Sequence, residues 1–364
     1  MAIKNGELPN ANEVATELAL SDTMLRLILD LDSNGIITFT RSDYDNVTWD
    51  AFVNDTYYDD GNSSNVQLNV TANLIALDVD NTNEVYAADF TGVARDGTYT
   101  ASKAGGPTVT FDAANDEEDF AQSATGVSSG GNATLTHDTT YRDGAVIFKL
   151  DNMSANTDLS GGGTSSYLRV SAFGVNVTRT IDNAGGGYNA DFDDETNTWA
   201  ATSPSYIRIS RTAGKTKTES SPDGSAWTTQ TDTDTATIGT AVAPTCVLFY
   251  SNNVVSGSAT ASLQAWSING LHSTGYFISN SVTAGANALT ASTIWDVTAG
   301  GTGSSTTVDI TADGTNYETG ITEKSFNEFS NVGTSLNIKL NLNADTAEVE
   351  SPYFTKYAYQ WNEG

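Results

Sequence analysis

Oxygen-bearing side chains alternate near the start of the chain in the spacing of a calcium-binding loop. Asp30, Asp32 and Asn34 match the first, third and fifth positions of an EF-hand-type loop, with glycine at the sixth position. The twelfth position, which needs a bidentate Glu, is Arg41. Because a cation there takes the place of the key ligand, an Asp/Asn-Gly turn after a helix is favoured over a metal site. Ca²⁺ bound by Asp30, Asp32 and Asn34 is kept as the alternative, and no other cofactor is expected.

Three aromatic residues lie beside glycine-rich and acidic loops in the middle of the chain. Tyr188, Trp199 and Tyr206 could each stack a ring on a sugar. Packing in a core competes with this function at all three positions, most strongly at Tyr206, whose neighbours alternate as in a strand. These three residues are the predicted glycan-binding residues.

The sequence contains no pattern that predicts catalysis. The two histidines, His137 and His272, lie among Thr, Ser and Asp, and neither has the sequence context of the base in a catalytic triad. A glycosidase needs two carboxylates on either side of a cleft. The nearest acidic run, Asp116 to Asp119, is contiguous and is interpreted as a loop, because in a strand its side chains would point to both faces. No catalytic residue is predicted, and the chain is expected not to be an enzyme.

The charge balance excludes whole classes of partner. The 364 residues carry 45 acidic and 16 basic side chains, a formal net charge of -29. Such a chain is repelled by phosphate backbones and by anionic lipid head groups, so neither nucleic-acid binding nor membrane insertion is expected. The single cysteine, Cys246, lies in an apolar run and is predicted to be a small buried hydrophobic residue. No apolar stretch near the start has the form of a signal peptide.

The elements that must position these residues are almost all strands. Apolar residues spaced three and four apart predict one helix within residues 12–31, and everything after Ile36 alternates as strands do. The expected class is all-β, with multidomain β-sandwiches and a short helical N-terminal arm. The expected division of the chain is a docking arm, a small β region, a central sandwich and a C-terminal β domain, at residues 1–34, 35–104, 105–271 and 272–364.

One hairpin pattern occurs twice. Ser221 to Thr228 and Thr311 to Glu318 both carry an Asp-Gly turn with an aromatic residue three positions after the glycine. Glycine supplies the positive φ of a tight turn, and the aromatic ring covers the neighbouring strand. Related hairpins in two domains and convergent turn chemistry explain the match about equally well.

The middle of the chain resembles the concanavalin A-like lectin/glucanase (laminin-G-like) family. The resemblance rests on the strand Tyr206 to Arg211, the hairpin Ser220 to Trp227, and the closing strands Val247 to Ser251 and Ala261 to Ile268. It covers about 150 residues, from near Phe111 to Leu271, and implies a jelly-roll sandwich. Enzymes of this family usually carry a Glu-x-Asp-x-x-Glu run on one strand, and this sequence has none.

The two ends of the chain resemble structural proteins of tailed bacteriophage virions. The opening Met1 to Ala11 is similar to their short N-terminal arms. The runs Asn331 to Leu340 and Ser351 to Trp361 are similar to the β domains of phage tail and fibre proteins. The resemblance implies a non-enzymatic appendage or decoration protein on the outside of the particle, assembled in the host cytoplasm.

Several partners and two rival functions follow from this interpretation. The expected partners are other virion proteins of the capsid, neck or tail, further copies of the chain in a homo-oligomer, with a trimer favoured, and a host-surface polysaccharide. The first rival is a cellular extracellular carbohydrate-binding adhesin, which would need an export route. The second is a polysaccharide-degrading glycosidase, which would need a pair of carboxylates.

Overall fold

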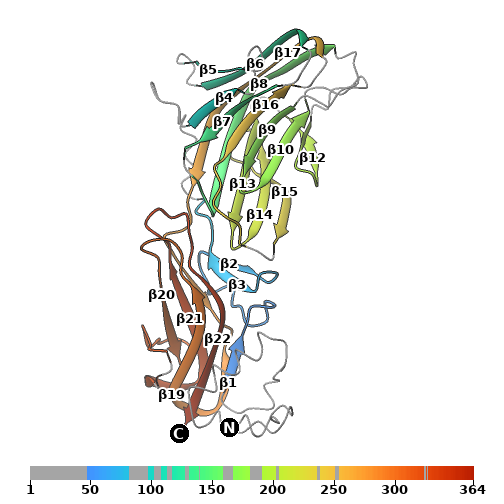
Figure 1. Cartoon of the computed structure of the whole chain (residues 1–364). Coiled ribbons are helices and arrows are strands. Elements are labelled where there is room, and N and C mark those ends of the chain that lie inside the picture. Colours follow the sequence, from blue (N-terminus) through green and yellow to red (C-terminus); the bar gives the residue numbers. More distant parts are fainter. Residues whose placement is uncertain are drawn as a thin grey trace, which may run out of the picture. The chain divides into compact units, whose positions relative to one another are not determined.

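The structure is a computed structural model, shown in Figure 1. It describes residues 47–81, 97–101, 108–112, 117–127, 131–138, 140–158, 167–180, 191–201, 205–235, 238–250, 254–323, 325 and 327–364. These residues form strands and turns and no helix, so the all-β class is confirmed. The expected helical arm, the calcium ligands Asp30, Asp32 and Asn34, and Tyr188 lie outside the described residues. Within the described part, no helix is long and apolar enough to cross a membrane.

The chain divides into two compact units, which we call the terminal unit and the central sandwich. The terminal unit combines Met1–Asp78 with His272–Gly364, and the central sandwich is Val79–Leu271. The terminal unit contains one eight-stranded sheet in the order β18-β21-β19-β22-β3-β2, with β1 paired to β22 and β20 paired to β21. Its strands are β1 (Val47–Asp50), β2 (Val66–Asn69), β3 (Leu74–Leu77), β18 (Thr274–Ile278), β19 (Val282–Thr298), β20 (Ser305–Thr311), β21 (Asn327–Asn343) and β22 (Tyr353–Glu363).

The units differ from the expected division at the small β region, 35–104. Its described strands β1 to β3 belong to the same sheet as the C-terminal strands, with Trp49 opposite Ala358 and Ile75 opposite Phe354. The next strand, β4 (Gly97–Ala101), belongs instead to the central sandwich, where it pairs with β7 (Gly131–His137). Strand pairing joins segments far apart in the sequence, so the local pattern of a strand does not predict which other strand it pairs with. The later end of the sandwich, Leu271, is the same in both divisions.

The central sandwich consists of two antiparallel seven-stranded sheets. The first, which we call the β10 sheet, has the order β12-β11-β10-β9-β16-β7-β4, and the second, the β13 sheet, has the order β15-β14-β13-β8-β17-β6-β5. Their remaining strands are β5 (Thr108–Asp112), β6 (Glu117–Val127), β8 (Gly144–Asp158), β9 (Tyr167–Ala172), β10 (Val175–Thr180), β11 (Asp191–Asp193), β12 (Thr198–Ala200), β13 (Ser205–Thr212), β14 (Lys215–Ser221), β15 (Thr228–Asp234), β16 (Thr245–Tyr250) and β17 (Val254–Asn269).

One apolar cluster fills the space between these two sheets. Phe148 of β8 and Ile209 of β13 contribute from the β13 sheet, and Val170 and Cys246 contribute from the β10 sheet; all four are buried. Side chains alternate between the two faces of a strand, so the residues between these core positions point away from the core. Burial raises the pKa of the Cys246 thiol, and its predicted place as a small buried hydrophobic residue is confirmed.

The two recurring hairpins have the same turn. In each, a hydroxyl two residues earlier donates to Oδ1 of the aspartate, at 3.0 Å for Asp223 and 2.9 Å for Asp313. The same oxygen accepts two N–H groups, from the residues two and three positions later. The glycine after each aspartate has a φ of +76° or +79°. Hydrogen bonds lower the pKa of both carboxyls. The largest effect comes from the Ala226 backbone N–H at Asp223 and from the Asn316 side chain at Asp313.

Candidate functional site

The face of the β13 sheet that points away from the core carries aromatic and charged side chains, and we call it the outward face. Ile207 and Ile209 of β13 lie in the core, so Tyr206 and Arg208 point the other way. Tyr206 pairs across the strands with Lys149 of β8, whose Nζ lies 5.8 Å from the centre of the tyrosine ring. The structure therefore places Tyr206 on the outward face, outside the apolar cluster.

An ion pair holds the middle of the outward face in place. Arg208 Nε lies 2.6 Å from Glu219 Oε2, and Lys217 Nζ lies 2.6 Å from Glu219 Oε1. Burial raises the pKa of Glu219, but hydrogen bonds from Arg208 and Lys217 outweigh it, so that the pKa is lower than usual. The guanidinium of Arg208 also lies 4.4 Å from the centre of the Trp227 ring. The ion pair and this cation–π contact position the partly exposed indole ring.

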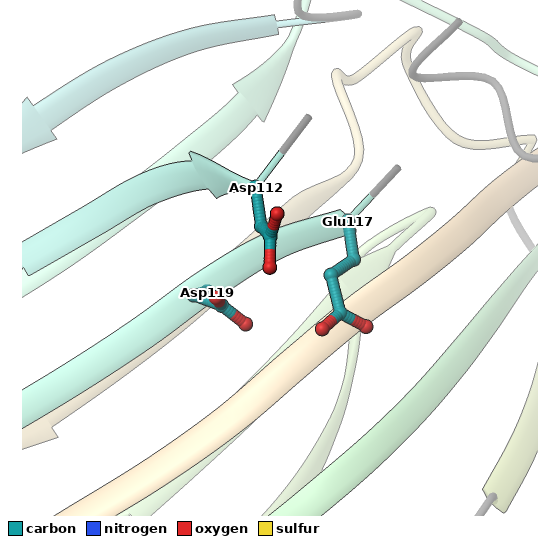
Figure 2. Close-up of side chains that lie close together, drawn as sticks. All are labelled: Asp112, Glu117 and Asp119. Carbon is teal, nitrogen blue, oxygen red and sulfur yellow. The ribbon is translucent and has the colours of Figure 1, made fainter. Parts of the chain in front are cut away.

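Three carboxylates lie together on two neighbouring strands of the same sheet, as Figure 2 shows. Asp112, the last residue of β5, pairs directly with Glu117, the first residue of β6, and Asp119 follows two positions later on the same face. Their ligand oxygens all lie within 4.8 Å of one another. Glu117 is buried, whereas the other two are partly exposed. Phe120 lies in the core, so this cluster also belongs to the outward face.

Further polar side chains continue from the acidic cluster onto the next strands. Ser262 of β17 donates its hydroxyl to Asp119 Oδ1 at 2.7 Å, and the amide of Asn152 of β8 donates to the Ser262 oxygen at 3.2 Å. Asn152 has a φ of +50°, beside a register shift between β8 and β17. The bulge thus places a polar side chain next to the cluster.

The acidic cluster corrects the interpretation of the run Asp116 to Asp119 as a loop. Glu117 to Asp119 lie in strand β6, and Asp116 lies outside the described residues. Alternation brings Glu117 and Asp119 to one face, and a neighbouring strand adds Asp112. The Glu-x-Asp spacing was visible in the sequence, but the third carboxylate depends on strand pairing. Three close carboxylates suit a hard cation such as Ca²⁺, and a pair of carboxylates is the group that glycoside hydrolysis uses.

The two predicted aromatic residues that the structure describes, Trp199 and Tyr206, do not form one platform. Trp199 of β12 stacks on Phe192 of β11, with ring centres 6.0 Å apart, and packs against the core. Tyr206 lies on the opposite sheet and points away from the core, so the two rings have no common surface. Sequence reasoning treated Trp227 only as part of a hairpin. Its ring contacts Arg208, which lies two positions after Tyr206 on β13, so Trp227 and Tyr206 both belong to the outward face.

Comparison with known proteins adds structural neighbours. No protein-family model matches the chain, and no curated protein matches its sequence. Among solved structures, the chain is similar to a Bacillus licheniformis β-glucanase at 11% identity, covering 50% of this chain and 94% of that one, with a TM-score of 0.33.

Two further neighbours are lectin domains. The Ca²⁺-bound exoplasmic/lumenal domain of VIP36 is 8% identical, over 48% of this chain and 88% of that one, with a TM-score of 0.30. A legume lectin-like domain from Entamoeba histolytica is 11% identical, over 47% of this chain and 88% of that one, with a TM-score of 0.29.

Proposed function

We propose that this chain is a non-enzymatic structural protein on the exterior of a tailed phage particle and that its central sandwich binds host-surface glycans. The observation that carries the glycan-binding half is the outward face of the β13 sheet, which combines the rings of Tyr206 and Trp227 with fixed charged groups. The virion half rests on the two ends of the sequence, which resemble phage tail and fibre proteins.

The outward face has the chemistry that carbohydrate recognition uses. An aromatic ring covers the C–H face of a sugar, and carboxylate, ammonium and guanidinium groups bind its hydroxyls. Within the described residues, the acidic cluster of Asp112, Glu117 and Asp119 would suit a Ca²⁺ ion, at a place other than the alternative site Asp30, Asp32 and Asn34. A single shallow face binds weakly, and a trimer would raise the avidity by presenting three copies at once. The appendage could belong to the capsid, neck or tail.

Retention of the protein on host cells or isolated host polysaccharide tests the glycan-binding half. We expect Trp227→Ala to lower retention markedly, because it removes the ring that Arg208 positions. Tyr317→Ala is the matched control, since Tyr317 occupies the same place in the hairpin of the terminal unit. Equal retention of both variants and the unchanged protein, or no retention of any, would contradict the proposal. Mass spectrometry of purified particles tests the virion half, and absence of the protein from them would refute it.

The acidic cluster favours a second candidate function, hydrolysis of a polysaccharide. A glycosidase needs one carboxyl as acid and one as base or nucleophile, and Glu117 and Asp119 are close enough to act as a pair. Release of new reducing ends from a panel of polysaccharides, lost in Glu117→Gln, would favour this candidate. Under the non-enzymatic proposal we expect no release by either protein, whereas glycan retention by Glu117→Gln shows that the variant is folded.

A further inference from the structure

A polar hollow of about 210 Å³ lies at one edge of the central sandwich, between the two sheets. The edge strand β15 and its neighbour β14 form one wall, and the turn after β9, the start of β10 and the turn after β11 in the other sheet form the opposite wall. Its lining includes the exposed residues Glu195 and Thr196 and the buried residues Thr218 and Asp194. The lining therefore extends from solvent-exposed to buried side chains.

The wall formed by β14 and β15 is polar where a sandwich is normally apolar. Thr218 pairs directly with Ile209, a core residue, so its side chain points between the sheets. Thr218 also pairs with Thr231, and Thr216 pairs with Thr233, which places four threonines on this inner face. Positions that face the opposite sheet usually carry apolar side chains that fill the core. Here the four threonines present hydroxyl and methyl groups to the hollow instead.

The opposite wall is held in a defined shape. Asp194 Oδ1 accepts the N–H groups of Thr196 at 3.1 Å and Asn197 at 2.9 Å, and its other oxygen accepts the hydroxyl of Thr231. The carboxylate thus ties the turn after β11 to strand β15 of the other sheet. Glu195, at the tip of this turn, has a φ of +73°. The hollow is accordingly formed before any ligand arrives, which lowers the entropy cost of binding.

The lining disfavours anionic ligands, and its hydroxyl and carboxylate groups suit a ligand rich in hydroxyl groups. Its charged residues are Asp194 and Glu195, and no Lys or Arg is among the described residues that line it. The cation on the inner face of β13, Arg211, donates to the backbone carbonyls of Phe173 and Thr240 instead. Two carboxylates repel phosphate, sulfate and uronate groups. Threonine hydroxyls and carboxylates bind sugar hydroxyls, and threonine methyl groups contact the C–H surface of a ring.

We propose that this hollow binds one neutral saccharide unit, end-on between the two sheets, as a site separate from the outward face. The inference rests on the proposed function in that the ligand is a glycan. The volume, about 210 Å³, is below the roughly 300 to 1,000 Å³ of pockets for drug-sized ligands, so a single terminal unit is bound rather than a chain. A glycan lying on the outward face and a chain end in the hollow would be two contacts on one sandwich, which increases avidity.

Monovalent binding of small saccharides to the full chain tests the site. The probes are neutral mono- and disaccharides of glucose, galactose and mannose, with glucuronate and galacturonate as acidic counterparts, measured by calorimetry and by NMR of threonine methyl groups. We expect a neutral saccharide to shift methyl signals of Thr218 and Thr233, and the double variant Thr218→Val/Thr233→Val to bind about tenfold more weakly, since two hydrogen bonds are lost. The control is Thr229→Val, which should bind normally. Thr229 lies on β15 like Thr233, but it pairs with Glu219 and is outside the lining.

The other outcomes separate this inference from the proposed function. If the double variant binds as the unchanged protein does while Trp227→Ala does not bind, the hollow is refuted and the outward face remains the glycan site. Preference for the uronates would also refute the hollow as a neutral site. If no saccharide binds to the unchanged protein and no methyl signal moves, both the hollow and the glycan-binding half of the proposed function are refuted. If the double variant does not fold, the spectrum of the unchanged protein still tests the hollow, because a neutral saccharide that binds without shifting the methyl signals of Thr218 and Thr233 would refute it.

Discussion

The buried carboxyl of Asp50 destabilises the terminal unit at neutral pH, and its replacement should stabilise the protein. Asp50 ends β1 and is 5% exposed, opposite Tyr357 of β22. Its surroundings are aromatic, since Phe52 lies 5.4 Å from Phe277 and 5.8 Å from Tyr357 between ring centres. Burial raises the pKa of Asp50 from 3.8 to about 6, although its Oδ1 accepts the N–H of Phe52 at 2.8 Å.

The size of the effect follows from this pKa. A shift of roughly two units corresponds to about 3 kcal/mol between the protonated and ionised forms. Because the folded state holds its proton to higher pH than the unfolded state, the unchanged protein loses stability as pH rises from about 4 to about 6. An asparagine side chain at this position would keep an oxygen for the Phe52 amide and would carry no charge. We expect Asp50→Asn to gain about 1 to 3 kcal/mol at pH 7.5, because its added N–H groups also need partners, and little at pH 4.

Calorimetric or denaturant unfolding of the full chain at pH 4 and pH 7.5 measures this difference. The control is Asp55→Asn, an exposed residue of the same segment, for which we expect no comparable gain. A gain that is the same at both pH values would show that charge burial is not its cause. A loss of stability at pH 7.5 would refute the reasoning altogether, because the ionised carboxylate would then be the better partner for the residues around it.

Three further results are expected from the central sandwich. The Cys246 thiol should not react with an aromatic disulfide reagent in the folded protein and should react fully in denaturant; reaction at the rate of an exposed thiol would contradict its burial. Phe148→Ala should lower the free energy of unfolding by about 3 to 5 kcal/mol and Phe148→Leu by less, because the residue is fully buried in the core. Arg208→Ala should cost about 3 to 5 kcal/mol in denaturant unfolding, since it removes one of the two cations that hold a buried Glu219; a loss below about 1 kcal/mol would show that Lys217 alone compensates the charge.

Trp227 shows which part of a candidate site a local sequence pattern predicts and which part it does not. The Asp-Gly turn and the aromatic residue three positions later were visible in the sequence, and both hairpins contain the same hydrogen-bonded turn. The cation on Trp227 comes from β13, and a cation near the equivalent Tyr317 comes from Lys339 of β21. The sequence predicts the turn because its hydrogen bonds join neighbours, whereas the partner of each ring depends on strand register.

The same distinction applies to the candidate sites. Strand alternation was enough to predict an all-β chain, because the period of two is a local property of the backbone. The apolar run around Cys246 was enough to predict its burial, because it too is local in the sequence. The acidic cluster required Asp112 and Glu117 to meet across two strands, and the hollow required two threonine pairs to face a turn of the other sheet. No local sequence pattern predicts these contacts, since each depends on which strands become neighbours and in which register.

The periodicity of the strands determined what this protein is built from, and the charge of -29 predicts repulsion of polyanions. Acidity repels phosphate and anionic lipid wherever the carboxylates lie, and alternation specifies strands whatever they pair with. Only the tertiary structure decided that β1 to β3 join the C-terminal strands, that Trp199 and Tyr206 belong to different surfaces, and that three carboxylates converge. The physical reason is that pairing and packing join residues far apart in the chain, and their free energy depends on the whole fold.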